Sequence, residues 1–351
     1  MAEKIPLVSV IIPMYNAAKF ITQTLECLLY QSMKDFEVVV ADDCSTDNSI
    51  EVVQNFASNF GGRLKLIRLA KNTGTPDIPR NEAIKVADGK YVTFLDHDDF
   101  YAPPALEELS TLAEEFQADV VHTDEFFYFD ATGKNYSSFE ELVANEDFKV
   151  KTCRKEGTPL LQQATFEPKD LAERIKLWLN DEFHWATWAL FIRKDFWVAN
   201  KLAFPRMTVS GDALGNFYCL CLAKKLLRVP NVTYLHCGNP KSITNEAANP
   251  EKYLRRWLSD LTVGFREFVK FMDTIPFFRE KIGYRYAVLN WFFEKFMRDA
   301  QQLPFAYSQV HTALLNQIIE QEFSGDDAAL TAYLFNVVNL QRLELAKFHK
   351  Q

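Results

Sequence analysis

Four short apolar runs, rich in β-branched residues, recur at nearly constant intervals in the first third of this 351-residue chain. They begin at Leu7, Phe36, Leu64 and Tyr91, which are 29, 28 and 27 residues apart. The segments between them, residues 17–29, 48–60 and 78–87, carry apolar residues at helical spacing. Short buried strands that alternate with helices are typical of a parallel sheet covered by helices on both faces. The sequence therefore predicts an α/β fold.

The pattern changes further along the chain. Residues 126–180 are irregular, as expected of long loops around a substrate site. Residues 185–191 and 229–236 are predicted to be strands. From residue 251 onward the spacing is helical, with breaks at Pro276, Pro304 and Gly325. We predict an α/β domain over residues 1–245 and a helical C-terminal region over residues 246–351.

Composition excludes several classes of protein. The formal net charge is −8, from 47 acidic and 39 basic residues, which argues against a nucleic-acid-binding protein. The six cysteines form no C-x-x-C pair, so we expect free thiols in a reducing compartment. The N-terminal residues lack the layout of a signal peptide, and no run of 18 apolar residues occurs. We expect a cytoplasmic protein that contacts a membrane at most peripherally.

An acidic cluster, Asp96-His97-Asp98-Asp99, directly follows the predicted strand over residues 91–95. Ligands of a parallel sheet bind at the carboxyl ends of its strands. Three carboxylates so close together repel one another unless a cation or hydrogen bonds offset their charge. Carboxylate oxygens suit Mg²⁺ or Mn²⁺, which are often shared with substrate phosphates. The alternative is a solvated acidic turn before the helix expected from Pro104 to Phe116.

Two further strand ends carry polar residues. The first strand is followed by Tyr15 and Asn16, and the second by Asp42 and Asp43. An aromatic ring stacks on a base, a carboxylate accepts hydrogen bonds from a base or ribose, and a metal ion neutralises a diphosphate. Together with the acidic cluster they predict a nucleotide-diphosphate site. The first turn contains no G-x-G-x-x-G and the chain no G-x-x-x-x-G-K-[ST], so neither phosphate-binding motif is present.

These motifs, in this order, resemble the family 2 glycosyltransferases. The similarity rests on the segments at residues 6–16 and 40–47, on the Arg80-Asn81 step and on the acidic cluster at residues 96–99. It is strong over residues 6–115, weaker over 185–245 and absent from the helical region. Cys44 stands where the family usually has glycine. The resemblance implies a GT-A fold, a nucleotide-sugar donor and inversion at the anomeric carbon.

The resemblance also implies roles for individual residues of the donor site. Asp43 would recognise the edge of the base, typically uracil. Asp96, His97 and Asp98 form the D-x-D motif, in which Asp98 would bind the metal directly and Asp96 would lie nearer the ribose. The other implied contacts are Pro13, Tyr15 and Asn16 with the base and ribose, Arg80 with the base and phosphates, and Asp99 and His236 with the metal ion. The segment Lys241–Thr244 resembles a loop near the diphosphate.

The catalytic base is expected outside the acidic cluster. Asp212 matches the second acid of the family's Glu-Asp motif, and Gly211 occupies the position of the Glu. An inverting transfer needs one carboxylate to deprotonate the acceptor hydroxyl. The alternative for Asp212 is a cap on the helix that follows. Acceptor contacts are expected from His184, Trp185 and Trp188, for which core packing is an equally good interpretation.

The C-terminal helices are rich in aromatic residues. Phe292, Phe293 and Phe296 share one stripe, which normally forms the core of a helical bundle. Contact with a membrane surface that holds a lipid-linked acceptor, or formation of a homodimer, is the functional alternative.

Together these features predict a metal-dependent inverting glycosyltransferase. It would use Mn²⁺ or Mg²⁺ and move one sugar from a nucleotide-sugar, with UDP as the favoured nucleotide, to a hydroxyl of a glycan or lipid-linked acceptor in surface-glycan synthesis. A nucleotidyltransferase would need a Gly- and Lys/Arg-rich loop after the first strand, where this chain has Met14-Tyr15-Asn16-Ala17. A nucleotide-sugar-binding scaffold without turnover is the remaining alternative.

Overall fold

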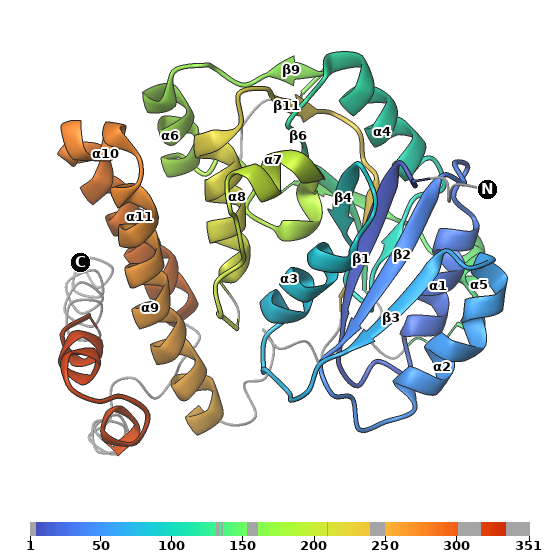
Figure 1. The fold of residues 1–351 in the computed structure, drawn as a ribbon, viewed down its shortest axis with the longest axis horizontal. Helices are drawn as coiled ribbons and strands as arrows, with labels where there is room; N and C mark the ends of the chain where they lie inside the picture. The colour runs from blue at the N-terminus through green and yellow to red at the C-terminus, as the bar shows by residue number, and fades with distance from the viewer. Residues whose placement is uncertain are drawn as a thin grey trace. The chain divides into compact units, whose positions relative to one another are not determined.

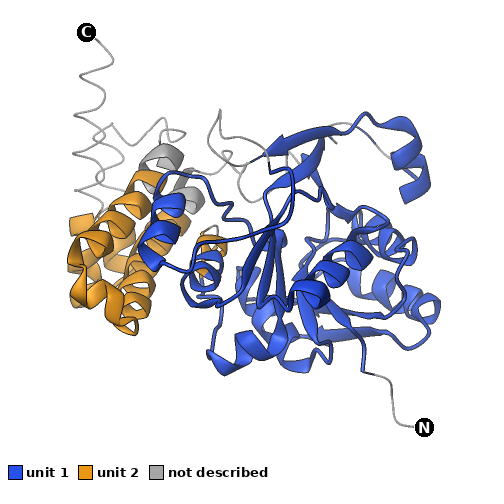
Figure 2. Ribbon diagram, turned by 90° about the horizontal axis from the view of Figure 1, so that it is seen from above, with its two compact units in different colours: residues 1–206, 215–240 blue, residues 207–214, 241–351 orange. Residues whose placement is uncertain are grey.

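The computed structural model describes residues 5–130, 134, 136–152, 161–208, 210–238, 250–300 and 317–334. The chain forms two compact units, coloured separately in Figure 2. The first contains residues 1–206 and 215–240, and the second contains residues 207–214 and 241–351. No single cut separates the two units, because the short segment 207–214 belongs to the second unit. The predicted domain boundary after residue 245 stays a prediction.

A large sheet of eight strands forms the centre of the first unit, in the order β3-β2-β1-β4-β10-β6-β11-β9. The four predicted βα strands are parallel neighbours at one end of it, whereas β10 runs antiparallel between β4 and β6. The strands are β1 (Val8–Met14), β2 (Phe36–Asp42), β3 (Leu64–Arg68), β4 (Tyr91–Phe94), β6 (Val120–Thr123), β9 (Thr165–Phe166), β10 (Leu190–Arg193) and β11 (Leu226–Val229). Strands β1 and β2 are buried along their whole length, as expected of a sheet covered on both faces.

Helices cover both faces of this sheet, which confirms the predicted α/β fold. In Figure 1, α1 and α2 lie on one side of β1–β3 and α3 lies on the other. The helices of the first unit are α1 (Ile21–Leu29), α2 (Ser49–Phe56), α3 (Asp77–Val86), α4 (Ala105–Phe116), α5 (Phe139–Asn145), α6 (Leu171–Leu179) and α7 (Lys194–Ala199), with 3₁₀ turns at Ala57–Phe60 and Thr187–Ala189. Helix α8 (Gly211–Leu222) begins in the second unit and continues in the first.

A second, smaller sheet follows the order β5-β12-β7-β8. Its strands are β5 (Phe100–Tyr101), β7 (Glu125–Asp130), β8 (Lys149–Thr152) and β12 (Tyr234–Gly238). Strand β5 directly follows the acidic cluster, so the small sheet begins where the fourth strand of the large sheet ends. This sheet accounts for part of the segment that the sequence predicts to be irregular.

Two predicted strands are wrong in position. Residues 185–189 form no strand, because a 3₁₀ turn occupies Thr187–Ala189 and β10 begins only at Leu190. The predicted strand over residues 229–236 is two strands in different sheets, β11 and β12, separated by residues 230–233. In both places aromatic and β-branched residues are present without forming one continuous strand. Residue type alone therefore does not show where a strand begins and ends.

The described part of the second unit is helical. It contains α9 (Pro250–Asp273), α10 (Pro276–Glu280) and α11 (Ile282–Ala300), with helical turns at residues 317–322 and 326–334. Phe292 is fully buried against Phe268, with ring centroids 5.1 Å apart, and Phe293 stacks on Phe265. The side chain of Phe296 lies outside the described residues. In the part of the chain that the structure describes, no helix has the length and apolar character needed to cross a membrane.

Gly89 provides a test of close packing at the amino ends of β1, β2 and β4. Its N–H donates to Ser9 Oγ at 2.9 Å, and a Cβ atom at this position would lie 2.5 Å from both Ser9 N and Ser9 Oγ. We predict that Gly89→Ala lowers the free energy of unfolding by about 1–3 kcal/mol, as expected of an overpacked core. Gly283→Ala is the control, because nothing lies within 4 Å of its Cβ position on α11. Denaturant unfolding should separate the two variants, and equal midpoints would show that the close approach at Gly89 does not restrict this position.

Candidate active site

The loops after β1 and β2 are held together by hydrogen bonds. Thr46 N donates to Asn16 Oδ1 at 2.8 Å, and Asn16 N donates to Ser45 Oγ at 2.9 Å. Ala17 N donates to Ser49 Oγ at 2.7 Å. Asn16 adopts a left-handed conformation with φ of 49°, which asparagine tolerates better than most residues. The Asn16 side chain therefore shapes the loop.

Tyr15 is the exposed aromatic residue of this edge, with 45% of its surface accessible. Pro13 is buried in β1, and its carbonyl oxygen lies 3.2 Å from His97 Nδ1. The ring of Tyr15 is thus available to stack on a flat ligand. Pro13 and His97 instead connect the end of β1 to the turn after β4.

Asp43 faces the loop that precedes α3. Its carboxylate accepts hydrogen bonds from Thr73 N at 2.9 Å, from Thr73 Oγ1 at 3.0 Å and from Gly74 N at 3.2 Å. Burial raises the pKa of Asp43 above its ordinary value, although the hydrogen bonds from Thr73 and Gly74 oppose this effect. Cys44 follows with φ of 63°, a left-handed conformation that glycine adopts more readily than cysteine. Asp43 therefore orders a loop at the sheet edge.

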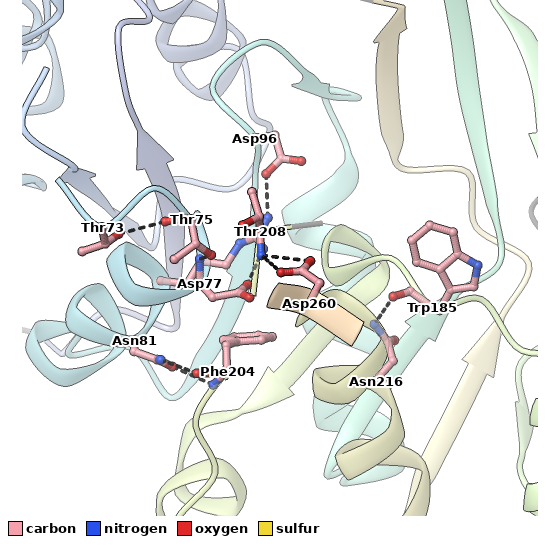
Figure 3. Close-up of polar contacts among 11 residues, drawn as sticks. Thr73, Thr75, Asp77, Asn81, Asp96, Trp185, Phe204, Thr208, Asn216 and Asp260 are labelled. Atoms are coloured by element: carbon pink, nitrogen blue, oxygen red, sulfur yellow. Dashed lines mark hydrogen bonds and ion pairs between the residues drawn. The ribbon is translucent and has the colours of Figure 1, made fainter. Parts of the chain in front are cut away.

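Arg80 bridges two carboxylates, those of Asp77 and Asp96, and both acids are drawn in Figure 3. Its Nη2 lies 2.9 Å from Asp96 Oδ1, and its Nη1 lies 3.1 Å from Asp77 Oδ1. Arg80 and Asp77 are 2% and 1% exposed, so both charges are removed from water. Arg80 thus lies against the acidic cluster, where it orients Asp96. Asp77 was not predicted from the sequence, although its position three residues before Arg80 on a helix was a usable signal.

Asn81, the second residue of the Arg-Asn step, pairs with the backbone of Phe204. Its Nδ2 donates to Phe204 O at 2.8 Å, and Phe204 N donates to Asn81 Oδ1 at 2.9 Å (Figure 3). The ring of Phe204 packs edge-on against Phe94, with ring centroids 5.3 Å apart. Asn81 therefore connects α3 to the segment after α7.

Asp99 joins the acidic cluster to the small sheet. It is 1% exposed, and its carboxylate accepts from Tyr234 Oη at 2.7 Å and from Cys237 N at 2.7 Å. His236 Nδ1 lies 3.0 Å from Asp99 Oδ2. These hydrogen bonds connect the acidic cluster to β12, and the role of Asp99 as a metal ligand stays a prediction.

His236 carries a positive charge in this arrangement. Burial of the ring opposes the charged form, but the nearby carboxylates, Asp99 first and then Asp96 and Asp98, together outweigh it and raise the pKa of His236 to about 9. The ring is therefore protonated at neutral pH. A metal ion at His236, as the sequence predicts, would have to displace this proton.

The acidic cluster offers oxygen ligands for a divalent ion. Asp96 and Asp98 are each partly exposed, and their oxygens are the ligands that Mg²⁺ and Mn²⁺ prefer. Among the described residues, no group of three or more His, Cys, Asp or Glu side chains is arranged to hold a metal ion. An ion shared with substrate phosphates needs only one or two carboxylates from the protein. The residues present fit that kind of site.

The segment predicted to contact the acceptor is divided between core and surface. His184 is 1% exposed, and its Nδ1 accepts from Ala186 N at 2.8 Å, so its burial favours a packing role over acceptor contact. Trp188 is partly exposed and stacks on Tyr234, with ring centroids 4.4 Å and planes 10° apart. Trp185 is also partly exposed, and its carbonyl accepts from Asn216 Nδ2 at 2.8 Å (Figure 3).

A buried charged cluster that the sequence did not indicate supports this segment. Arg228 Nε lies 2.6 Å from Glu167 Oε1, and Arg228 Nη1 lies 3.3 Å from Asp124 Oδ2. Arg228 Nη1 also donates to Glu182 O at 2.6 Å. His122 Nε2 lies 3.0 Å from His184 O. These contacts bring β6, β9 and β11 against residues 182–184.

Asp212 lies in the first turn of α8 and is partly exposed. It lies within a turn closed by a hydrogen bond from Ala213 N to Ser210 O at 3.2 Å. In the same unit, Asp260 is buried and accepts from Thr208 N at 2.8 Å (Figure 3). The segment Lys241–Thr244 lies outside the described residues.

A family model described as glycosyl transferase family 2 matches residues 9–197. The poly(ribitol-phosphate) β-N-acetylglucosaminyltransferase TarS of Staphylococcus aureus is 40% identical over 115 residues, which are 32% of this chain and 20% of TarS. The chain thus spans about a fifth of the length of this relative. The uncharacterised glycosyltransferase EpsJ of Bacillus subtilis is 26% identical over 247 residues, or 70% of this chain and 65% of EpsJ.

Two solved structures share the fold. Residues 1–349 of S. aureus TarS, in complex with UDP-GlcNAc, match with a TM-score of 0.61 and 18% identity over 95% of this chain and 88% of that one. The mannosyltransferase PcManGT of Pyrobaculum calidifontis, in complex with GDP-Man and Mn²⁺, matches with a TM-score of 0.51 and 17% identity over 97% and 88%. These likenesses show the GT-A fold.

The buried pair of Asp77 and Arg80 yields a stability prediction. We expect Asp77→Asn to lower the free energy of unfolding by about 3 kcal/mol, because it leaves a buried guanidinium with one carboxylate fewer. Glu82→Gln is the matched control, since Glu82 and Lys85 form an exposed pair with the same spacing on the same helix. Its cost should stay below about 0.5 kcal/mol. Urea unfolding of both variants measures the difference, and similar costs would contradict the assigned role of Asp77.

Proposed function

The chain belongs to glycosyl transferase family 2, and on this premise we propose that it transfers a single sugar from a nucleotide-sugar to an acceptor hydroxyl in surface-glycan synthesis. UDP is the favoured nucleotide, because the TarS structure that shares this fold was solved with UDP-GlcNAc. The observation that carries the proposal is the edge of the large sheet. There the exposed Tyr15, the ordered Asp43 loop and the partly exposed Asp96 and Asp98 follow three neighbouring strands.

The donor site would use these residues for different purposes. Tyr15 would stack on the base, and the loop held by Asp43 would border it. Asp96, oriented by Arg80, would accept from the ribose hydroxyls. Asp98, together with Asp96, would hold Mn²⁺ or Mg²⁺, which when bound neutralises charge on the leaving diphosphate. The Mn²⁺ in the PcManGT structure supports this choice of ion.

Asp212 would act as the general base. Its carboxylate would take the proton of the acceptor hydroxyl while the acceptor oxygen forms a bond to the anomeric carbon. The bond between that carbon and the diphosphate oxygen breaks, and the electron pair leaves with the nucleotide diphosphate. Attack from the face opposite the leaving group inverts the anomeric configuration. Gly211 replaces the Glu that usually precedes this acid in relatives, so Asp212 would perform the proton transfer without a carboxylate at the preceding position.

Nucleotide binding tests the donor site. We predict that UDP binds in the presence of Mn²⁺ more tightly than GDP, dTDP or CMP. Asp98→Ala should weaken this binding by about 100-fold or more, because loss of even an outer-shell partner of a metal costs 10- to 100-fold. Asp88→Ala is the control, since this exposed carboxylate precedes β4 whereas Asp98 follows it. Calorimetry measures all affinities, and no binding by any nucleotide would contradict the proposed donor site.

Turnover tests the catalytic base. We predict that Asp212→Asn lowers kcat by about 10²- to 10⁴-fold, the usual contribution of a general base, and leaves UDP affinity unchanged. Asp195→Asn is the control, because Asp195 is an exposed acid in the first turn of α7 and would report any general effect on a helix end. Release of UDP from a UDP-sugar with acceptor present is the measurement. Retained turnover in Asp212→Asn would remove the assignment.

A further inference from the structure

The small sheet presents two chemically different faces. Side chains alternate along a strand, so neighbours in register share a face. Leu235, Cys237 and Phe129 belong to the hydrophobic core of the first unit. The opposite face carries Tyr128 and Phe126 from β7, with His236 from β12 in register with Tyr128, and Phe126 is 7% exposed and also belongs to this core. The ring of His236 lies 6.0 Å from each of these two rings.

Strand β8 adds two lysines to this aromatic face. Lys149 is in register with Tyr128 and Lys151 with Phe126, so both project on the same side. Both lysines are exposed. Lys151 Nζ lies 3.5 Å from the centroid of the Tyr128 ring, which is a close cation–π contact. Because the two lysines lie two residues apart on one strand, their backbone positions are about 6.6 Å apart.

The same face is continuous with the acidic cluster. Asp99 contacts His236 and Tyr234, and Trp188 covers Tyr234 by stacking. Phe126 packs edge-on against Trp188, with centroids 5.0 Å apart. A surface therefore extends from Trp188 beside the cluster, across His236 and Tyr128, to the lysines of β8.

This surface carries exposed basic side chains. The chain has a formal net charge of −8, yet this face carries two exposed lysines beside His236, with Asp130 at its far end in register with Gly238. Partly exposed aromatic rings bind the C–H faces of sugars and polyols, and ammonium groups attract anions. Lysines on an edge strand also discourage pairing with another sheet. That effect alone predicts no influence on ligand affinity.

We propose that this aromatic and basic face, defined by Trp188, Tyr128, Lys149, Lys151 and His236, binds an acceptor whose repeating units carry negative charge. The shared chemistry is a hydroxyl-rich chain with phosphate diesters or uronate carboxylates. The rings contact its polyol or sugar units, the two lysines pair with successive anions, and one end reaches the acidic cluster. The inference rests on the proposed transfer function, because it assigns the acceptor of that reaction.

Acceptor binding by the full chain tests this assignment, measured by calorimetry in the presence of UDP and Mn²⁺. The probes are a ribitol-phosphate hexamer, a galacturonate hexamer and a neutral maltohexaose, which separate the two anion types from an uncharged chain. We expect an anionic hexamer to bind more tightly than the neutral one and to weaken as salt rises. The double variant Lys149→Gln/Lys151→Gln should lose about tenfold in affinity for it, as expected of two exposed ion pairs. Lys85→Gln/Lys201→Gln, two exposed lysines elsewhere, should bind as the wild type does.

The outcomes separate this inference from the proposed function. Tighter binding of the phosphate hexamer or of the uronate hexamer identifies the anion type and supports the proposal. Three results would overturn the proposal and leave the donor site intact. These are equal binding of all three hexamers, binding that the β8 variants do not change, and no hexamer binding while UDP still binds. Absence of UDP binding in the wild type would overturn the proposed function itself, and the acceptor assignment with it.

Discussion

The Asp99 carboxylate is the contact on which both proposed ligand-binding surfaces of the first unit depend. It ends the acidic cluster at the edge of the large sheet, and it accepts hydrogen bonds from Tyr234 and Cys237 of the small sheet. A buried carboxylate without partners would be strongly destabilising, so these bonds fix the position of β12 relative to the cluster. The same carboxylate holds His236 and, through Tyr234, the stacked Trp188. The proposed donor and acceptor surfaces thus share one buried anion.

The cluster tolerates three neighbouring carboxylates because each has a different environment. Asp99 is neutralised by the small sheet and Asp96 by Arg80, which is itself held by Asp77. Asp98 is partly exposed and remains near solvent. Opposite charges at short range lower the cost of each anion, whereas exposure leaves Asp98 suited to an exchangeable ion. The contacts that offset the charges of Asp99 and Asp96 therefore make the proposed binding of a metal ion at Asp98, together with Asp96, physically reasonable.

Much of the fold was accessible from local sequence patterns, whereas the partners of the site residues were not. The parallel strands and helix α4 were predicted closely because a short, apolar, β-branched run between turn residues has few alternatives. The strand predicted at residues 185–191 begins only at Leu190, and the preceding Trp188 instead packs against Tyr234 and Phe126. Asp77 was not predicted, although it lies only three residues before Arg80 in the chain. The ion pair of Arg228 and Glu167 was not predicted because it joins segments that are far apart in the sequence.

The sequence by itself determined the α/β fold, the three polar strand ends and the family resemblance, since each depends on residue type and spacing over a few neighbours. Only the tertiary structure decided which acid faces solvent, which is buried, and which lysines share a face with Tyr128. A side chain's charge state and availability depend on the atoms packed around it, and in a sheet those atoms come from distant strands. Burial, register and pairing are therefore properties of the folded chain.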